Sequence, residues 1–448
     1  MDTEELRARV VADMPRVRDE LEQLVRIPGC AFPGFPDEEI QRACDKAIEI
    51  LTAAGYAKVE KLDIEGGKPA VLAETPGPEG SPTVLLYAHY DVQPGGDPSL
   101  WHTHPFEPVE RDGRLYGRGA ADDKSGVVMH AALMRAFGGE PPCTIRVVLE
   151  GEEEWGGPFE QYPRKHPELF DADAIVVADV GNARIGDPTF TTALRGMASV
   201  TVECRTLEGS VHSGMFGGPA PDALMALITL LATLRDENGD TAIDGIDGYA
   251  WPGAQMDEDT FRELAGVLPD QPLVGSGTVA SRLYTMPVVN VIGIDAPPAQ
   301  GAINAVIPEA RARVSLRIPP GADARAARKA LVEHLRSHAP WGISVTVTPD
   351  AVGEGVEVDT SGPAYAAARQ AMELSYGQPA QEIGAGGSIP LIDSLREGVP
   401  DAEILLFGAQ DPMARIHAPN ESVDLAELQR ALLAEVLFVA IFGGSGNG

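Results

Sequence analysis

The first 60 residues carry apolar side chains at helical spacing. This spacing predicts helices over residues 5–27 and 37–55, the second ending at Gly55, a residue type favoured just after a helix. Short apolar runs and one further helical pattern follow. Strands are predicted at 58–64, 70–74, 83–92, 144–154 and 173–180, and a helix at 123–139. Apolar strands that alternate with helices predict an α/β layer whose sheet is covered on both faces.

The pattern changes between about residues 191 and 350. A strand candidate at 192–206 alternates apolar and polar residues, which is typical of a strand with one exposed face. A stretch rich in Gly, Pro and Asp occupies residues 240–277 and predicts irregular structure. Helices are predicted at 221–239 and 323–337, and strands at 287–295, 310–318 and 343–349. We therefore expect an α+β module with an open antiparallel sheet.

Helix and strand alternate again after this module, at 363–377, 403–408 and 425–443. The return of the first pattern indicates that the second domain is inserted into the first. We expect one domain formed by residues 1–190 and 351–448, and a second formed by residues 191–350.

The chain has 448 residues and a formal net charge of -32 at pH 7. Nucleic-acid binding requires a basic surface that neutralises phosphates, and anionic membranes attract basic segments. The excess of acid therefore argues against both kinds of partner. An acidic surface keeps a protein soluble, and it does not by itself indicate a substrate.

The cysteines and the apolar stretches predict a cytoplasmic location. The four cysteines form no CxxC pair or zinc-knuckle spacing, which is typical of reduced thiols. The N-terminal segment lacks the basic and apolar regions of a signal peptide. The longest apolar stretch, near the C-terminus, is interrupted by Glu435 and is too short to span a bilayer, which favours a buried helix.

Two polar pairs indicate candidate metal chemistry. His89 and Asp91 end a predicted strand, where residues two apart point to the same side. His89 could bind a metal there while Asp91 accepts its other ring N–H. Asp122 and Asp123 lie in a Gly-rich turn before a helix. One aspartate suffices as a helix cap, and a second carboxylate can bridge two cations. Either pair alone would also fit an acidic surface.

Further acidic and imidazole groups follow other predicted strands. The segment LEGEEEWGG (149–157) places four glutamates directly after an apolar run. Asp179 closes the next strand, and His417 lies in the loop-like segment ARIHAPNE. One glutamate could bind a metal, and a neighbour could act as the general base of a hydrolysis. Carboxylates combined with imidazoles suit Zn²⁺, and Mn²⁺ or Co²⁺ less selectively.

Six segments together resemble a known family. They are YAHYDVQP, GRGAADDKSG, EGEEEWGG, VHSGMFGG, GGSIP and HAPNE. In this order, and over nearly the whole chain, they resemble the aminoacylase–carnosinase family of dinuclear zinc peptidases, and HSGMFGG is most similar to its carnosine dipeptidase branch. The resemblance implies a catalytic α/β/α domain with a mixed, mainly parallel sheet at 1–190 and 351–448. Residues 191–350 would form an α+β lid that also makes a homodimer.

The resemblance also implies two Zn²⁺ ions per chain and a set of ligands for each ion. Five side chains would hold the metals: His89, Asp122, Glu154, Asp179 and His417. His89 and Asp179 would bind one ion, Glu154 and His417 the other, and Asp122 would bridge the two.

Two acidic residues, Asp91 and Glu153, complete the expected catalytic centre. Asp91 would orient His89, and Glu153 would be the general base that takes a proton from a metal-activated water. The base and its neighbouring ligand are aligned to Glu153 and Glu154 because Gly156 follows at the expected offset. Glu152 has no role in this alignment.

The lid carries residues that resemble substrate-binding positions. His212 would stabilise the oxyanion, in the family often from the partner subunit. Asn304, Arg317 and Ser388 would contact substrate, with Arg317 gripping a terminal carboxylate. The chain has Ala385 before the GGSIP segment, where the family often has an arginine, and any preference that depends on that arginine is open.

The resulting hypothesis is a cytoplasmic metallopeptidase that hydrolyses the amide bond of dipeptides or similar short peptides. Substrate would bind between the catalytic domain and the lid. Removal of an acyl or succinyl group from an N-acyl amino acid is an alternative that the same centre would support. A binding protein that keeps the fold without catalysis is a third reading, and it usually requires the loss of ligands that this chain retains.

Overall fold

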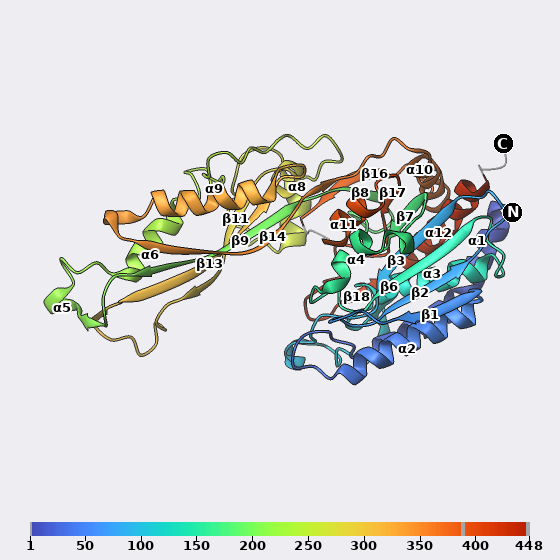
Figure 1. Cartoon of the computed structure of the whole chain (residues 1–448), viewed down its shortest axis with the longest axis horizontal. Helices are drawn as coiled ribbons and strands as arrows, with labels where there is room; N and C mark the ends of the chain where they lie inside the picture. Colours follow the sequence, from blue (N-terminus) through green and yellow to red (C-terminus); the bar gives the residue numbers. More distant parts are fainter. Residues whose placement is uncertain (1, 387–389, 445–448) are drawn as a thin grey trace. The chain divides into compact units, whose positions relative to one another are not determined.

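The structure is a computed structural model that describes residues 2–386 and 390–444. The chain forms two compact units (Figure 1). Unit 1 combines Met1–Thr192, Val358–Ile383 and Leu391–Gly448, and unit 2 combines Ala193–Glu357 and Gly384–Pro390. Among the described residues, no helix has the length and apolarity that crossing a bilayer would need.

A mixed sheet forms the centre of unit 1. Its strands are, in spatial order, β1 (Lys58–Leu62), β2 (Ala70–Thr75), β6 (Thr144–Glu150), β3 (Thr83–His89), β7 (Ala174–Val177) and β17 (Glu403–Leu406). The β1–β2 and β2–β6 pairs are antiparallel, whereas β6–β3, β3–β7 and β7–β17 are parallel. The prediction of a mixed, mainly parallel sheet is confirmed.

Both faces of this sheet are buried. One core joins it to α1 (Thr3–Val25), α2 (Asp37–Ala54), α3 (Lys124–Ala136), α10 (Pro363–Tyr376) and α12 (Leu425–Gly444). Leu86 of β3 belongs to that core, whereas its neighbours Leu85 and Tyr87 are fully buried on the opposite face. Because side chains alternate along a strand, such a strand must be covered on both sides, as its continuous apolar sequence predicted.

Smaller elements complete unit 1, and others lie where the chain passes from one unit to the other. One small sheet has the order β18 (Ser422–Asp424), β5 (Arg114–Tyr116) and β4 (Val109–Arg111). Another has the order β15 (Val356–Glu357), β8 (Thr189–Leu194) and β16 (Gln381–Ala385). The remaining helices are α4 (Tyr162–Lys165), α11 (Pro390–Gly398) and the 3₁₀ turns Pro98–Leu100, Pro158–Gln161 and Pro167–Leu169.

Unit 2 is built on an antiparallel sheet, as predicted. Its order is β11 (Val288–Asp295), β13 (Glu309–Ile318), β9 (Gly196–Arg205) and β14 (Val345–Gly353). One face packs against α6 (Ala223–Ala232) and α9 (Ala324–Ser337) in a separate core. Alternate residues of β9 and β13, such as Val200 and Val314, supply that core, so the residues between them point to the other face.

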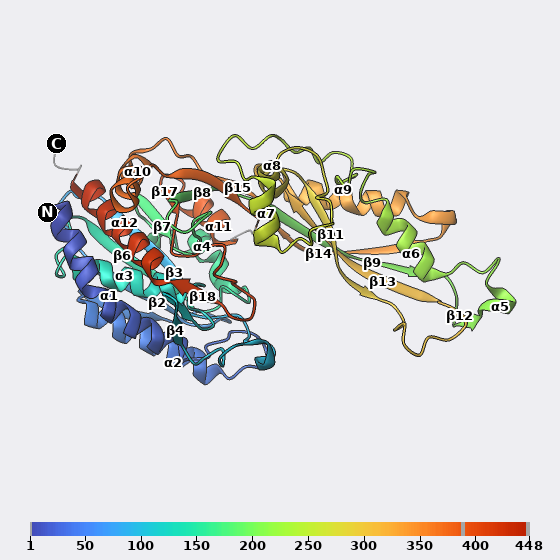
Figure 2. The same cartoon turned by 180° about the vertical axis from the view of Figure 1, so that it is seen from behind.

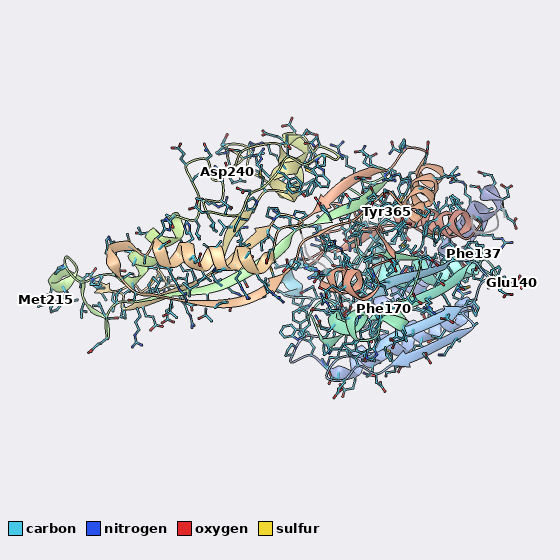
Figure 3. The ribbon with its side chains drawn as sticks, turned by 45° about the horizontal axis from the view of Figure 1, so that its top comes forward. Phe137, Glu140, Phe170, Met215, Asp240 and Tyr365 are labelled. Atoms are coloured by element: carbon cyan, nitrogen blue, oxygen red, sulfur yellow. The ribbon has the colours of Figure 1, made fainter. Side chains whose placement is uncertain are left out.

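Further short elements lie at opposite ends of unit 2. The β10–β12 pair (Val211–His212 with Ala305–Val306) and α5 (Ser213–Phe216) form one end, and α8 (Val279–Tyr284) lies at the other (Figures 1 and 2). Met215 of α5 is 74% exposed at its tip (Figure 3). The stretch expected to be irregular contains α7 (Glu258–Ala265), a short helix that begins at the cap residue Asp257. The 3₁₀ turn Pro340–Gly342 precedes β14.

Candidate metal centre

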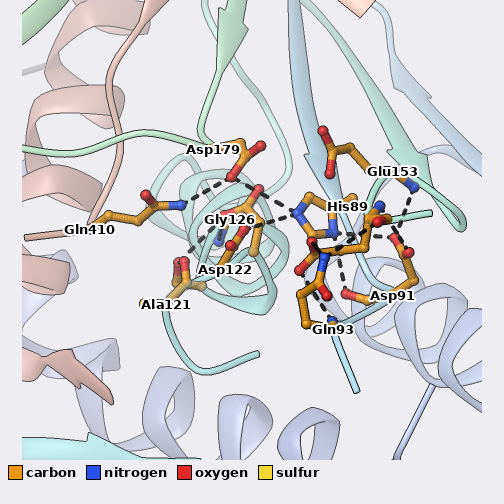
Figure 4. A network of polar contacts seen from close by, with 12 residues as sticks. His89, Asp91, Gln93, Ala121, Asp122, Gly126, Glu153, Asp179 and Gln410 are labelled. Atoms are coloured by element: carbon orange, nitrogen blue, oxygen red, sulfur yellow. Dashed lines mark hydrogen bonds and ion pairs between the residues drawn. The ribbon is translucent and has the colours of Figure 1, made fainter. Parts of the chain in front are cut away.

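Neighbouring parallel strands bring the predicted ligands to one edge of the unit 1 sheet. β6, β3 and β7 are adjacent and parallel, and β3 ends at His89. The segment with Glu153 and Glu154 follows β6, and Asp179 follows β7. Because the carboxyl ends of parallel strands share an edge, residues far apart in sequence meet there. Asp122 enters from the turn that precedes α3 (Figure 4).

Asp122 lies between two imidazoles and presents one oxygen to each. Its Oδ1 is 3.1 Å from Nε2 of His89, and its Oδ2 is 3.0 Å from Nε2 of His417. The same His417 nitrogen is 3.1 Å from Oε2 of Glu154, and Nε2 of His89 is 3.9 Å from Oδ1 of Asp179. All five predicted ligands therefore converge, with the Asp122 carboxylate between the two imidazoles.

The donor set fits divalent cations. Donor atoms of His89, Asp122 and Glu154 lie within 4.8 Å of one another, and so do those of His89, Glu153 and Asp179. These two groups share one histidine and place three or more hard oxygen donors around it. Imidazole nitrogen with carboxylate oxygen is a donor set that binds Zn²⁺ and related dications.

Charge at the cluster is unbalanced without cations. Burial, reinforced by neighbouring carboxylates, raises the pKa of Glu153 to about 8. Burial and the Asp122 carboxylate raise the pKa of Asp179 well above its ordinary value. Hydrogen bonds to Asp122 and Glu154 raise the pKa of His417 to about 10. Crowded carboxylates disfavour ionisation and favour positive charge beside them, so dications fit this site.

Asp91 links His89 to the glutamate segment. Its Oδ1 lies 3.2 Å from Nδ1 of His89, on the ring side opposite Asp122. The same carboxylate accepts the backbone N–H groups of Glu153 at 3.1 Å and Glu154 at 3.2 Å. One buried aspartate thus fixes both the imidazole ring and the backbone of the two glutamates (Figure 4).

Two acidic residues next to the proposed ligands, Asp123 and Glu152, had no assigned role in the sequence analysis, and their side chains lie outside the donor groups around His89. Asp123 accepts the N–H of Gly126 at 3.2 Å and caps α3. The neighbouring Asp122 is therefore the aspartate that belongs to the cluster. The Glu152 side chain turns toward Gly67 and Gly157, where an added Cβ would collide with its carboxylate. Within the described residues, Glu152 does not join either donor group around His89.

Sequence reasoning missed four residues that support the cluster. Glu421 accepts the N–H groups of Ala121 and Asp122 at 3.1 and 3.2 Å, and Arg118 binds its other oxygen at 2.6 Å. Glu421 ends the HAPNE segment, which was a usable signal.

The other two missed residues are amides. Gln410 donates to Oδ1 of Asp179 at 3.0 Å, and Gln93 donates to Oε2 of Glu154 at 2.7 Å. Gln93 lies in the YAHYDVQP segment, but nothing in the local pattern around Gln410 indicates its contact.

The predicted lid residues of unit 2 do not gather in one place. His212 is exposed, pairs with Ala305, and accepts the N–H of Gly214 at 3.1 Å. Asn304 lies beside it and accepts the N–H of Ser213. Arg317 lies near the far end of β13, eight residues beyond Glu309, or about 26 Å of extended chain. Ser388 lies outside the described residues.

This fold and this cluster define a class: an α/β protein with an inserted α+β unit and a carboxylate–imidazole metal centre. The model of peptidase family M20/M25/M40 matches residues 85–440. The chain therefore belongs to this family, and it is a metallopeptidase in class.

Individual relatives agree with the family. The chain is 42% identical over 371 residues to the cysteinylglycine-S-conjugate dipeptidase of Corynebacterium striatum, covering 81% of this chain and 82% of that protein. It is 26% identical over 454 residues to the Cys-Gly metallodipeptidase dug1 of Schizosaccharomyces pombe, covering 90% and 91%. The crystal structure of human carnosine dipeptidase 1 has the same fold, with a TM-score of 0.84, 24% identity and 99% of each chain covered.

Proposed function

We propose that this protein is a dipeptidase that hydrolyses the amide bond of short peptides at a dinuclear metal centre. The observation that carries the proposal is the Asp122 carboxylate, whose two oxygens face His89 and His417. His89 and Asp179 would hold one ion, and Glu154 and His417 the other. When bound, the ions supply positive charge that polarises the scissile carbonyl and makes a water acidic enough to be deprotonated.

Glu153 is proposed as the general base. Its carboxylate lies with His89 and Asp179 in one donor group, so it borders the metal positions. Asp91 fixes its backbone N–H, which limits how far the side chain can move. In this role Glu153 takes a proton from the attacking water and passes it to the leaving amine.

Cysteinylglycine peptides with a substituted sulfur are the proposed substrate class. The Corynebacterium striatum relative, which is named for such peptides, motivates this choice. Trp155 follows Glu154 directly, is 52% exposed, and has its ring 5.0 Å from that of Phe32. The exposed Trp155 ring, packed against the half-buried Phe32 and next to a metal-site glutamate, offers an apolar surface that suits an S-alkyl group.

A substrate panel tests this function. Zinc-loaded protein is assayed with Cys-Gly, S-benzyl-Cys-Gly, β-Ala-His and N-succinyl or N-acetyl amino acids. Hydrolysis of the dipeptides with little turnover of the N-acyl compounds supports the dipeptidase. The reverse preference would identify the protein as a deacylase of N-acyl amino acids. No turnover of any compound would favour a binding protein that keeps the fold without catalysis.

Zinc is the proposed metal, and the cytoplasm the proposed location. Two imidazoles among the five proposed ligands favour Zn²⁺, with Mn²⁺ or Co²⁺ as weaker candidates. Cys30, Cys44, Cys143 and Cys204 are all buried free thiols, which is typical of proteins from reducing compartments. Metal analysis of protein purified from its own cells, without added metal, tests the first proposal.

We further propose a homodimer in which His212 and Asn304 serve the active site of the partner subunit. The two residues lie at one end of the unit 2 sheet and Arg317 near the other, a separation that one dipeptide cannot span. Unit 2 also exposes an edge strand, β11, on which Val291, Ile292 and Ile294 are 45–58% exposed. An apolar edge strand of this kind pairs readily with another chain.

A further inference from the structure

Arg195 and Arg317 lie on the same face of the unit 2 sheet. Arg317 of β13 pairs directly with Met197 of β9. Arg195 precedes Met197 by two residues, so the two side chains share a face, away from the α6–α9 core. In an antiparallel sheet such diagonal neighbours have Cα atoms about 7–8 Å apart, well within reach of two long side chains.

This part of unit 2 holds buried polar side-chain atoms without partners. Arg195 is 9% exposed, and its Nε and Nη1 find no hydrogen-bond acceptor among the described residues. Ser199, on the same face, is 2% exposed and its Oγ is also unpartnered. A buried donor that lacks an acceptor destabilises the fold, and a charged one does so more strongly. A ligand that supplied the acceptor would remove this cost.

The two guanidinium groups also lack a counter-charge. Within the described part of the chain, neither Arg195 nor Arg317 forms an ion pair, whereas Arg313 on the same strand pairs with Asp350 at 3.5 Å. Burial and the neighbouring Arg317 lower the pKa of Arg195 to about 10, and burial also lowers the pKa of Arg317. Two cations that face one another in a partly buried site create a strong preference for an anion.

The backbone of residues 385 and 386 lies close to Arg195. Its N–H donates to the carbonyl of Ala385 at 3.3 Å, which holds the following glycine close by. A Cβ added at Gly386 would lie 2.9 Å from Nη2 of Arg195. A side chain at that position would crowd the guanidinium, so glycine avoids a contact that would displace it.

We propose that Arg195 and Arg317 together bind the C-terminal carboxylate of the substrate, and that Arg195 is a specificity-determining residue for peptides with a free C-terminus. The inference rests on the proposed dipeptidase function and adds a second guanidinium to the one expected at Arg317. A planar carboxylate can accept from two guanidinium forks at once, whereas a C-terminal amide carries no charge and brings its own N–H donors.

The test compares an acid and an amide substrate in the zinc-loaded full-length protein. Wild-type protein and Arg195→Met are assayed with Cys-Gly and with Cys-glycinamide. We expect the variant to lose about 10- to 100-fold in kcat/KM on Cys-Gly, mainly through KM, because a charged hydrogen-bonding partner is removed. On the amide we expect a change of less than about 3-fold, so that the preference for the acid collapses.

Two further variants separate recognition from structure. Arg195→Lys keeps the charge without the fork and should recover part of the preference for the acid. Arg313→Met removes an exposed arginine of the same strand and should leave the preference unchanged. An equal loss on acid and amide in Arg195→Met, with metal content and circular dichroism unchanged, would show that Arg195 only supports the fold, and would overturn the proposal.

Direct binding distinguishes failure of this inference from failure of the proposed function. Calorimetric titration with N-acetylglycine and N-acetylglycinamide needs no turnover of a dipeptide. Acid-selective binding that Arg195→Met weakens at least 10-fold supports the carboxylate site, even if no dipeptide is hydrolysed. Equal binding of both compounds, or binding that is unchanged in the variant, contradicts it.

Discussion

The two units carry clusters of opposite charge, and neither cluster is balanced by the residues that the structure describes. In unit 1 the carboxylates outnumber the two imidazoles beside them. At the sheet edge of unit 1, the carboxylates of Asp122, Glu153 and Asp179 crowd around His89. On the sheet face of unit 2, Arg195 lies diagonally from Arg317, and its Nε and Nη1 have no hydrogen-bond partner among the described residues. A folded protein rarely buries uncompensated charge, because desolvation costs several kcal/mol per ion. This imbalance motivates both proposals: cations as the ligands of the cluster in unit 1, and a carboxylate as the ligand of the arginine pair in unit 2.

The two clusters also differ in how firmly the chain holds them. Around the metal centre, Asp91, Glu421 and Gln410 hold the proposed ligands or their backbone by hydrogen bonds. Such supporting contacts preorganise a site whose donor geometry must be accurate. The arginine pair has few such contacts among the described residues, as suits a site completed by a ligand that arrives and leaves in every turnover.

The largest effect should come from removing the metals, which tests the acidic cluster directly. Dialysis against a chelator should abolish hydrolysis and lower the melting temperature, since repelling carboxylates then stay buried without cations. Adding two equivalents of Zn²⁺ should restore both. The measurements are dipeptide turnover and scanning calorimetry. A chelated, metal-free protein with full activity would rule out the metal centre.

Loss of the proposed base should come next. We expect Glu153→Gln to lower kcat by about 10²–10⁴-fold while two metals per chain remain bound, because proton transfer is lost and the ligands are not. Kinetics and atomic emission on the same sample measure both quantities. Glu152→Gln is the matched control, since its side chain points to Gly67 and Gly157. If Glu152→Gln were the inactive one, the assignment of the base would be wrong.

His212 of unit 2 tests the proposed homodimer. His212→Ala should reduce kcat by about 10²–10³-fold, the usual loss for one oxyanion donor. Co-expression with Glu153→Gln should then restore activity, because a mixed dimer pairs one intact Glu153 with the intact His212 of the other chain. Random pairing in a two-fold dimer predicts about a quarter of wild-type activity. No recovery in purified mixed dimers would place His212 in its own chain's site.

The smallest effect concerns the apolar surface beside the acidic cluster. Trp155→Ala should reduce kcat/KM for S-benzyl-Cys-Gly by about 10-fold, and for Gly-Gly by less than about 2-fold, since one lost apolar contact is worth 1–3 kcal/mol. Competition between the two peptides measures the ratio in a single assay. Leu100→Ala, at another exposed apolar position of unit 1, serves as control. An unchanged ratio would remove Trp155 from substrate selection.

Local patterns in the sequence sufficed for the main strands and helices and for most of the acidic cluster, but not for short elements such as α7. The continuous apolar run of β3 required burial on both faces, and the alternation of β9 required one core face. His89, Asp179 and the glutamate segment lie at the ends of such runs, where α/β folds place their sites. The Gly-rich turn and the ARIHAPNE segment also indicated Asp122 or Asp123 and His417, and the family resemblance then assigned Glu154 as the ligand within the glutamate segment and Asp122 as the bridge.

The tertiary structure alone decided the partners that depend on register and on distant contacts. Arg195 stands in a strand-like segment where an arginine usually faces solvent, and only the pairing of β9 with β13 sets it beside Arg317 in a buried site. Gln410 reaches Asp179 across 231 positions of sequence. Spacing along the chain encodes which face a residue occupies, but the residue opposite it depends on how separate strands align, which no local pattern records.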